Sequence, residues 1–193
     1  MADFESMKIV AREILDSYSN AYVVGSMALA LYEKKYLGTI THDPEDIDIV
    51  IISNQELGST PYDTRILKLI NESDLTSTKG TKFKYIGGVD DINVDVDVDV
   101  IRQTIRGNVE KIFKDNSVVI EGIACQKLKI LESAYENVAE DSMVQGKIDA
   151  SEIKLVVINR VKETEQWKQE QEQEQEEETK EKKQKTTSNL SRT

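Results

Sequence analysis

Apolar residues recur at helical spacing over residues 5–18, so this segment is predicted to form an α-helix. The apolar run 21–24 predicts a short strand that ends at Gly25-Ser26. From there to Gly38 the chain is rich in strong helix formers, and glycine is a common helix stop. The chain is therefore predicted to begin with a helix, a strand, a Gly-Ser turn and a second helix.

Aspartate alternates strictly with aliphatic residues in two later segments. Residues 46–52 are Asp-Ile-Asp-Ile-Val-Ile-Ile, and residues 92–101 contain Val-Asp-Val-Asp-Val-Asp-Val. A period of two predicts strands, each with one carboxylate face. Residues 81–86 and the turn at Gly87-Gly88 predict a β-hairpin with the second segment, and we expect this hairpin to lie beside the first segment.

The remaining elements are predicted from the same periodicities. They are a helix from about Thr64, a helix around 105–113, a strand at 118–123, a helix from Gln126 to about Val138, and a final helix from about Ser151 that runs towards the C-terminal segment.

The composition changes after Val161. Trp167 and Leu190 are the only apolar residues beyond that point, and the rest is Gln/Glu, then Lys, then Ser/Thr. Such a segment cannot build a hydrophobic core. We therefore expect residues 1–161 to form one domain and residues 162–193 to be a low-complexity charged tail, either helical or disordered.

The net charge of -11 lies mainly on the predicted domain. The chain has 36 acidic and 25 basic residues, of which the tail holds 9 and 7, so 27 acids and 18 bases (a net charge of -9) remain in residues 1–161. An acidic body repels phosphate backbones, so broad nucleic-acid binding is not expected. The ligands that remain compatible with this charge are small molecules, proteins, or nucleic acid held through a local patch or a metal.

Two features bear on the compartment. Cys125 is the only cysteine, which excludes an internal disulfide, and its apolar neighbours predict a buried position rather than a nucleophile. No stretch approaches ~18 apolar residues, and the acidic start lacks the basic segment of a signal peptide. We expect a cytoplasmic protein with no membrane partner.

Gly25-Ser26 and the paired aspartates are the candidates for chemistry. A glycine at a strand-to-helix turn lets an anion such as a triphosphate approach the free N–H groups of the helix start, although Ser26 could instead be a simple N-cap. Asp46 and Asp48 share one strand face at ~6.5–7 Å spacing. A divalent cation between them would offset their repulsion; a solvated strand face is the alternative.

The second acidic strand carries three aspartates on one face, Asp95, Asp97 and Asp99. As the outer face of an edge strand, these charges would discourage aggregation and need no ligand. An EF-hand does not fit, because the pattern lacks the glycine and the final glutamate of that loop. Metal ligation and edge protection therefore both remain open for this strand.

Taken together, these motifs resemble the DNA polymerase beta-like nucleotidyltransferase superfamily, whose pattern is hG[GS], h[DE]h[DE]h and then h[DE]h. The resemblance spans roughly residues 20–101, and its matches are Val24-Gly25-Ser26, Asp46-Ile47-Asp48, and one of Asp95, Asp97 and Asp99. We favour Asp97 as the third acid, because a mid-strand residue has neighbours on both sides that fix its rotamer. Nineteen residues separate Ser26 from Asp46, which is longer than usual for the family, and Lys147 and Glu152 only faintly match its late basic and acidic positions.

The resemblance implies an α+β fold, with a nucleotidyltransferase-like mixed β-sheet flanked by helices, and a metal-dependent transferase. Asp46, Asp48 and Asp97, with Asp95 and Asp99 as alternates, would bind Mg²⁺ or Mn²⁺, and Asp97 would accept the proton of the nucleophile. Gly25 and Ser26 would hold the phosphates of a nucleoside triphosphate such as ATP.

The same resemblance implies that a nucleoside monophosphate moves to a hydroxyl acceptor and that pyrophosphate leaves. The acceptor is an aminoglycoside-like small molecule, a protein or a tRNA end. The alternatives are a catalytically inactive protein of this fold that acts through a protein partner bound by the tail, and a simple cation-binding β domain.

Overall fold

The computed structural model describes residues 3–18, 20–41, 44–53, 67–69, 81–85, 94–102 and 109–190, and the structural statements below refer to these residues. Helix α1 (Phe4–Ser17) begins at Asp3, whose carboxylate accepts a hydrogen bond from the Ser6 N–H at 2.8 Å. Phe4, Met7, Val10 and Ile14 lie three or four positions apart and are buried on one face, as the helical spacing predicts, whereas Ile9 is exposed.

Within the described residues, seven strands form one mixed sheet in the order β3-β4-β5-β2-β1-β7-β6. They are β1 (Ala21–Val23), β2 (Ile47–Ser53), β3 (Leu67–Leu69), β4 (Thr81–Tyr85), β5 (Asp95–Arg102), β6 (Ser117–Ile120) and β7 (Ile123–Gln126). The pairs β2–β5 and β1–β7 are parallel, and the other pairs are antiparallel. The predicted antiparallel pairing of β4 with β5 and the place of β5 beside β2 are confirmed, and the predicted turn at Gly87-Gly88 lies outside the described residues.

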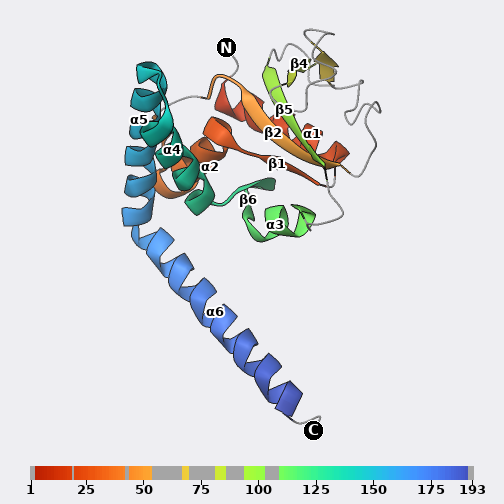
Figure 1. Ribbon diagram of the computed structural model, residues 1–193, viewed down its shortest axis with the longest axis vertical. Helices are drawn as coiled ribbons and strands as arrows, with labels where there is room; N and C mark the ends of the chain where they lie inside the picture. The colour runs from red at the N-terminus through yellow and green to blue at the C-terminus, as the bar shows by residue number, and fades with distance from the viewer. Residues whose placement is uncertain are drawn as a thin grey trace.

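Four further helices accompany α1 and the short helix α3 (Val109–Asp115). They are α2 (Gly25–Leu37), α4 (Leu128–Asp141), α5 (Gln145–Glu163) and α6 (Glu165–Leu190). Helix α2 packs against β2 and α5, and α4 and α5 pack against each other (Figure 1). Helices and sheet share one hydrophobic core, which includes Ile14, Val23, Leu31, Ile49, Val98, Leu131 and Ile158. The predicted α+β class is confirmed.

The structure corrects two of the predicted elements. The helix expected from about Thr64 is wrong where the chain is described, because Leu67–Leu69 is a strand that pairs with β4. The single strand expected at 118–123 is instead the β6–β7 hairpin. Its two turn residues, Glu121 and Gly122, have φ of 50° and 79°, the left-handed backbone that tight hairpin turns require.

Contacts from α1 hold that turn in place. Lys8 Nζ donates to the Glu121 carboxylate at 2.5 Å, and Arg12 donates to the Glu121 carbonyl oxygen at 2.8 Å through Nη2. The buried ammonium of Lys8 also pairs with Glu5 at 2.8 Å. These charge-assisted bonds offset the backbone strain of a non-glycine residue in the left-handed region.

Three other helix boundaries differ from the prediction. Helix α4 begins at Leu128 rather than Gln126, because Gln126 is the last residue of β7. Helix α5 begins at Gln145, earlier than the predicted start near Ser151. The helix expected around 105–113 is α3, which begins at Val109, and residues 105–108 lie outside the described part of the chain.

The C-terminal segment is helical where it is described. The Trp167 ring packs edge-on against Tyr36 and Tyr32, with ring centroids 5.3 Å and 6.0 Å apart. The Glu170 carboxylate accepts hydrogen bonds from Lys35 and from the Tyr36 hydroxyl, both at 2.7 Å. The first turns of α6 are therefore docked on α2, while the rest of α6 extends away from the sheet (Figure 1).

No helix in the described part of the chain combines the length and apolar character needed to cross a membrane.

Candidate functional site

Three aspartates converge where β2 and β5 run side by side. The parallel register places Asp48 directly beside Asp97, and Asp46 lies just before the first residue of β2. One carboxylate oxygen from each of the three lies within 4.8 Å of the others, and all three side chains are half-buried. We call Asp46, Asp48 and Asp97 the acid triad.

The other two predicted candidates do not join the acid triad. Asp95 is exposed, and its register partner on β4 is Lys84. Asp99 is half-buried, and its charge contributes to raising the pKa of Asp48. Because the valines between these aspartates are buried, β5 has the predicted carboxylate face, and Asp97 is its member in the acid triad.

Asp48 lies in an unfavourable electrostatic environment for a carboxylate. Burial, followed by the charges of Asp46 and Asp97, raises the pKa of the Asp48 carboxyl to about 6, and Lys154 opposes this effect. Removal from water and nearby like charges both penalise the ionised form. A divalent cation would reverse the balance, since carboxylate oxygens are the ligands that Mg²⁺ and Mn²⁺ prefer.

The start of α2 lies against Asp48, with no room for a side chain at Gly25. Gly25 has a φ of 62°, and a Cβ placed on it would lie 2.2 Å from Oδ2 of Asp48. The Val24 N–H, one residue earlier, donates to the Asp48 carbonyl oxygen at 2.9 Å. The strand-Gly-helix unit and the first acidic strand are thus joined at this point.

Ser26 does not cap α2. The N-cap is Val24, which makes no side-chain capping bond, and Ser26 is the second residue of the helix. Helix starts leave several N–H groups without intrahelical acceptors, and their dipole favours a negative charge. The half-buried Ser26 is therefore placed in an anion-favouring first turn beside the acid triad.

Two residues that the sequence did not single out interact electrostatically with Asp48. Tyr135 on α4 is buried, and its hydroxyl has no hydrogen-bond partner among the described residues. Burial and the charge of Asp48 both raise the pKa of Tyr135. Lys154 on α5 lies over the Tyr135 ring, with Nζ 5.0 Å from the ring centroid, and its charge acts on Asp48.

The residues that faintly match the family's late basic and acidic positions lie on the same helix as Lys154. Lys147 and Glu152 lie on α5 and are exposed, whereas Lys154, two residues after Glu152, interacts with Asp48. Nothing in the sequence around Tyr135 distinguishes it from the other apolar positions of an amphipathic helix.

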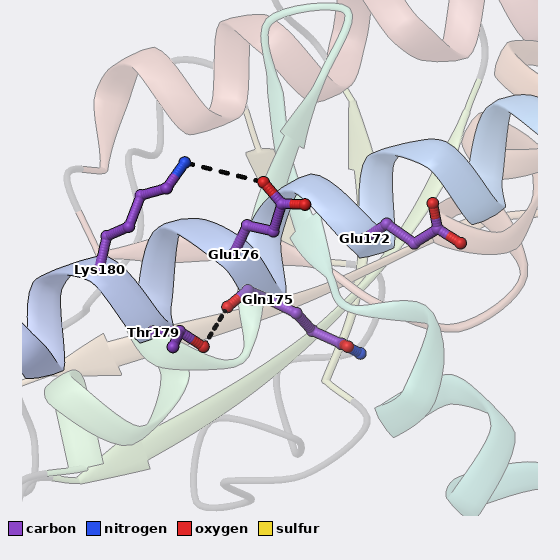
Figure 2. Close-up of a pocket in the computed structure, with 5 residues that line it drawn as sticks. All are labelled: Glu172, Gln175, Glu176, Thr179 and Lys180. Atoms are coloured by element: carbon purple, nitrogen blue, oxygen red, sulfur yellow. Dashed lines mark hydrogen bonds and ion pairs between the residues drawn. The ribbon is translucent and has the colours of Figure 1, made fainter.

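Cys125 and a shallow hollow on the outer part of α6 do not offer a competing catalytic site. Cys125 is buried, and burial raises the pKa of its thiol to about 12, which opposes thiolate formation. A hollow of about 460 Å³ on α6 is lined by one helix only, and four of its five lining residues contact one another (Figure 2). Lys180 pairs with Glu176 at 3.7 Å, and the Thr179 hydroxyl donates to the Gln175 carbonyl oxygen at 2.7 Å.

Among solved structures, the protein is similar to an antigenic nucleotidyltransferase-like protein from Paracoccidioides brasiliensis. The TM-score is 0.53 and the identity 14%, over 80% of this chain and 75% of that one. JHP933 from Helicobacter pylori matches with a TM-score of 0.41 and 15% identity, over 72% of this chain and 56% of that one, and we base no conclusion on it. No family model and no curated protein matches the sequence.

The chain therefore has a nucleotidyltransferase-like fold, and the resemblance drawn from its glycine and aspartate motifs is confirmed at the level of the fold. Its acid triad suits a divalent cation in such a fold.

Proposed function

We propose that this protein is a metal-dependent nucleotidyltransferase that moves a nucleoside monophosphate from a nucleoside triphosphate to a hydroxyl acceptor and releases pyrophosphate. The observation that carries the proposal is the convergence of Asp46, Asp48 and Asp97 beside the start of α2, in a nucleotidyltransferase-like fold.

The acid triad would hold Mg²⁺, with Mn²⁺ as the alternative. Three half-buried carboxylates are costly without a counter-charge, and they supply oxygen ligands only. When bound, the metal supplies charge neutralisation for the phosphates and a more acidic acceptor hydroxyl.

The chain's own residues would bind and orient the triphosphate and deprotonate the acceptor hydroxyl. The Gly25 N–H and the Ser26 hydroxyl hold the β- and γ-phosphates at the positive end of α2. Lys154 adds positive charge near Asp48, where the triphosphate would lie. Asp97 accepts the proton of the acceptor hydroxyl, the hydroxyl oxygen forms the new bond to the α-phosphorus, and pyrophosphate leaves.

The charge of the chain favours some acceptors over others. Residues 1–161 carry 27 acids and 18 bases, so a polycationic aminoglycoside-like molecule or a protein is attracted to the domain, and RNA is repelled. We therefore favour the first two acceptor classes over a tRNA end.

A transfer assay tests the proposal. The protein is incubated with each labelled nucleoside triphosphate, Mg²⁺ or Mn²⁺, and separately with aminoglycosides, tRNA or cell extract. We expect transfer that stops in Asp46→Asn, Asp48→Asn and Asp97→Asn. Asp16→Asn, which removes one exposed carboxylate from α1, is the charge-matched control and should remain active.

Two outcomes would contradict the proposal. If wild-type protein neither transfers a nucleotide nor binds a triphosphate in a metal-dependent way, the enzyme assignment is wrong. Metal-dependent triphosphate binding without transfer to any acceptor would instead favour the inactive binding protein of the same fold.

A further inference from the structure

A second cavity lies between the body of the domain and the first turns of α6. Its volume is about 210 Å³, and it is lined by the second half of α2, strand β6, the start of α4 and the beginning of α6. We call it the α2–α6 cavity. Its first lining residue on α2 is Tyr32, seven positions after Gly25, so about 10 Å of helix separates it from the acid triad.

Aromatic rings form much of the apolar lining of the α2–α6 cavity. Tyr32 and Tyr36 lie nearly parallel, with ring centroids 6.2 Å apart, and Trp167 packs edge-on against both rings. The two hydroxyls are engaged within the protein. That of Tyr32 accepts a hydrogen bond from the Leu128 N–H at 3.0 Å, and that of Tyr36 donates to Glu170 at 2.7 Å. These tyrosines therefore offer a ligand ring surface, which favours an aromatic partner.

The charged residues of the α2–α6 cavity differ from the acidic chain as a whole. Three lysines and two glutamates line it, in a chain of net charge -11. Lys35 pairs with Glu170 at 2.7 Å. Lys127 and Lys129 line the cavity from the start of α4, and neither forms a salt bridge with another described residue. Against these two ammonium groups stands only Glu174 among the described lining residues, so the lining attracts an anion.

We propose that the α2–α6 cavity binds a small aromatic anion, a single ring that carries a phosphate or a carboxylate group. The ring packs against Tyr32, Tyr36 and Trp167, and Lys127 and Lys129 bind the anionic group. The size agrees with this class of ligand, because a cavity of about 150 Å³ holds benzene. A volume of about 210 Å³ therefore accommodates one ring with a charged substituent. The acid triad and its metal take no part, so this inference does not depend on the proposed function.

The test is a binding measurement on the full chain in metal-free buffer, with phenyl phosphate, benzoate and inorganic phosphate as probes. Trp167 is the only tryptophan, so its fluorescence reports on this cavity, and titration calorimetry gives the affinities. We expect the better of the two aromatic anions to bind about tenfold more tightly than inorganic phosphate or better, because its ring is buried against the aromatic lining. Tighter binding of phenyl phosphate than of benzoate would identify the anionic group as phosphate, and the reverse order would identify it as carboxylate.

Lysine variants locate the binding. Lys127→Ala and Lys129→Ala should each lower the affinity for the aromatic anion about tenfold, which is the loss expected for one charge-assisted hydrogen bond. Lys114→Ala is the charge-matched control, because it removes an exposed lysine of α3 that does not line the cavity, and it should keep wild-type affinity.

Three results would overturn the inference. If neither phenyl phosphate nor benzoate binds, the cavity is not a site for aromatic anions. If inorganic phosphate binds as tightly as both, the rings contribute nothing. If Lys114→Ala weakens binding as much as the two cavity variants do, the attraction is a general effect of charge. None of these results bears on nucleotide transfer, so the proposed function would stand or fall separately.

Discussion

Gly25 and Gly38 offer a matched pair of substitutions at the two ends of α2. Both glycines have positive φ, 62° and 73°, so an alanine at either position pays a similar backbone penalty of about 1–2 kcal/mol. The Gly38 position has no atom within 4 Å of an added Cβ. At Gly25 the added Cβ would lie 2.2 Å from Oδ2 and 3.1 Å from Cγ of Asp48, so only this substitution disturbs the acid triad.

The distances at Gly25 set how far the Asp48 carboxylate must move. Real Cβ atoms essentially never approach another heavy atom closer than 3.0 Å, so Oδ2 of Asp48 must retreat by at least the difference from 2.2 Å, about 0.8 Å. A misplacement of about 1 Å in a catalytic group can lower the rate about 100-fold. We therefore expect Gly25→Ala to lose about 100-fold in nucleotide transfer and to bind Mn²⁺ more weakly.

The two variants are compared by urea unfolding, Mn²⁺ titration and the transfer assay. Gly38→Ala should lose only the backbone contribution to stability and should keep wild-type metal affinity. If Gly25→Ala and Gly38→Ala behave alike in metal binding and transfer, the close approach of Gly25 to Asp48 has no functional consequence.

Three further predictions concern stability and reactivity. The Asp48 pKa is raised from an ordinary 3.8 to about 6, so its stabilising contribution is complete below pH 3.8 and is lost as the pH rises through about 6. Between pH 5 and pH 7, the free energy of unfolding of the metal-free protein should therefore fall by about 1 kcal/mol, and this fall should be absent in Asp48→Asn. Equal pH dependence of the two proteins in urea unfolding would contradict this prediction. Trp167→Ala should cost about 1–2 kcal/mol in urea unfolding followed by circular dichroism, because its contacts with Tyr32 and Tyr36 are lost; unchanged stability would show that α6 is not docked. The Cys125 thiol, with its pKa raised to about 12, should react with a thiol reagent at pH 8 only after unfolding, and rapid labelling of native protein would show that it is accessible.

Local pattern predicted the strands and helices that carry a strong periodic signal. The α1 helix and the β4–β5 hairpin follow from residue spacing alone, because burial of one face requires a matching period. The segment from Thr64 was misassigned because its apolar spacing fits a helix, whereas Leu67–Leu69 pairs with β4. Strand pairing at a sheet edge is a long-range contact, and it overrides a weak local preference.

The β6–β7 hairpin was missed for a related reason. Its turn is Glu121-Gly122, and glutamate is not a residue that usually signals a tight turn with positive φ. Hydrogen bonds from Lys8 and Arg12, more than a hundred positions earlier in the chain, stabilise this turn. No local pattern could have indicated that support.

The alternation of aspartate with aliphatic residues determined by itself that Asp46 and Asp48 share one face and that Asp95, Asp97 and Asp99 share another, because a strand has a period of two. Which acid of the second strand lies beside the first follows from strand pairing in three dimensions, because the parallel register places Asp97 next to Asp48. The sequence alone likewise did not indicate Tyr135 and Lys154. They act on the charge of Asp48 from α4 and α5, and interactions between segments far apart in the sequence leave no periodic pattern along the chain.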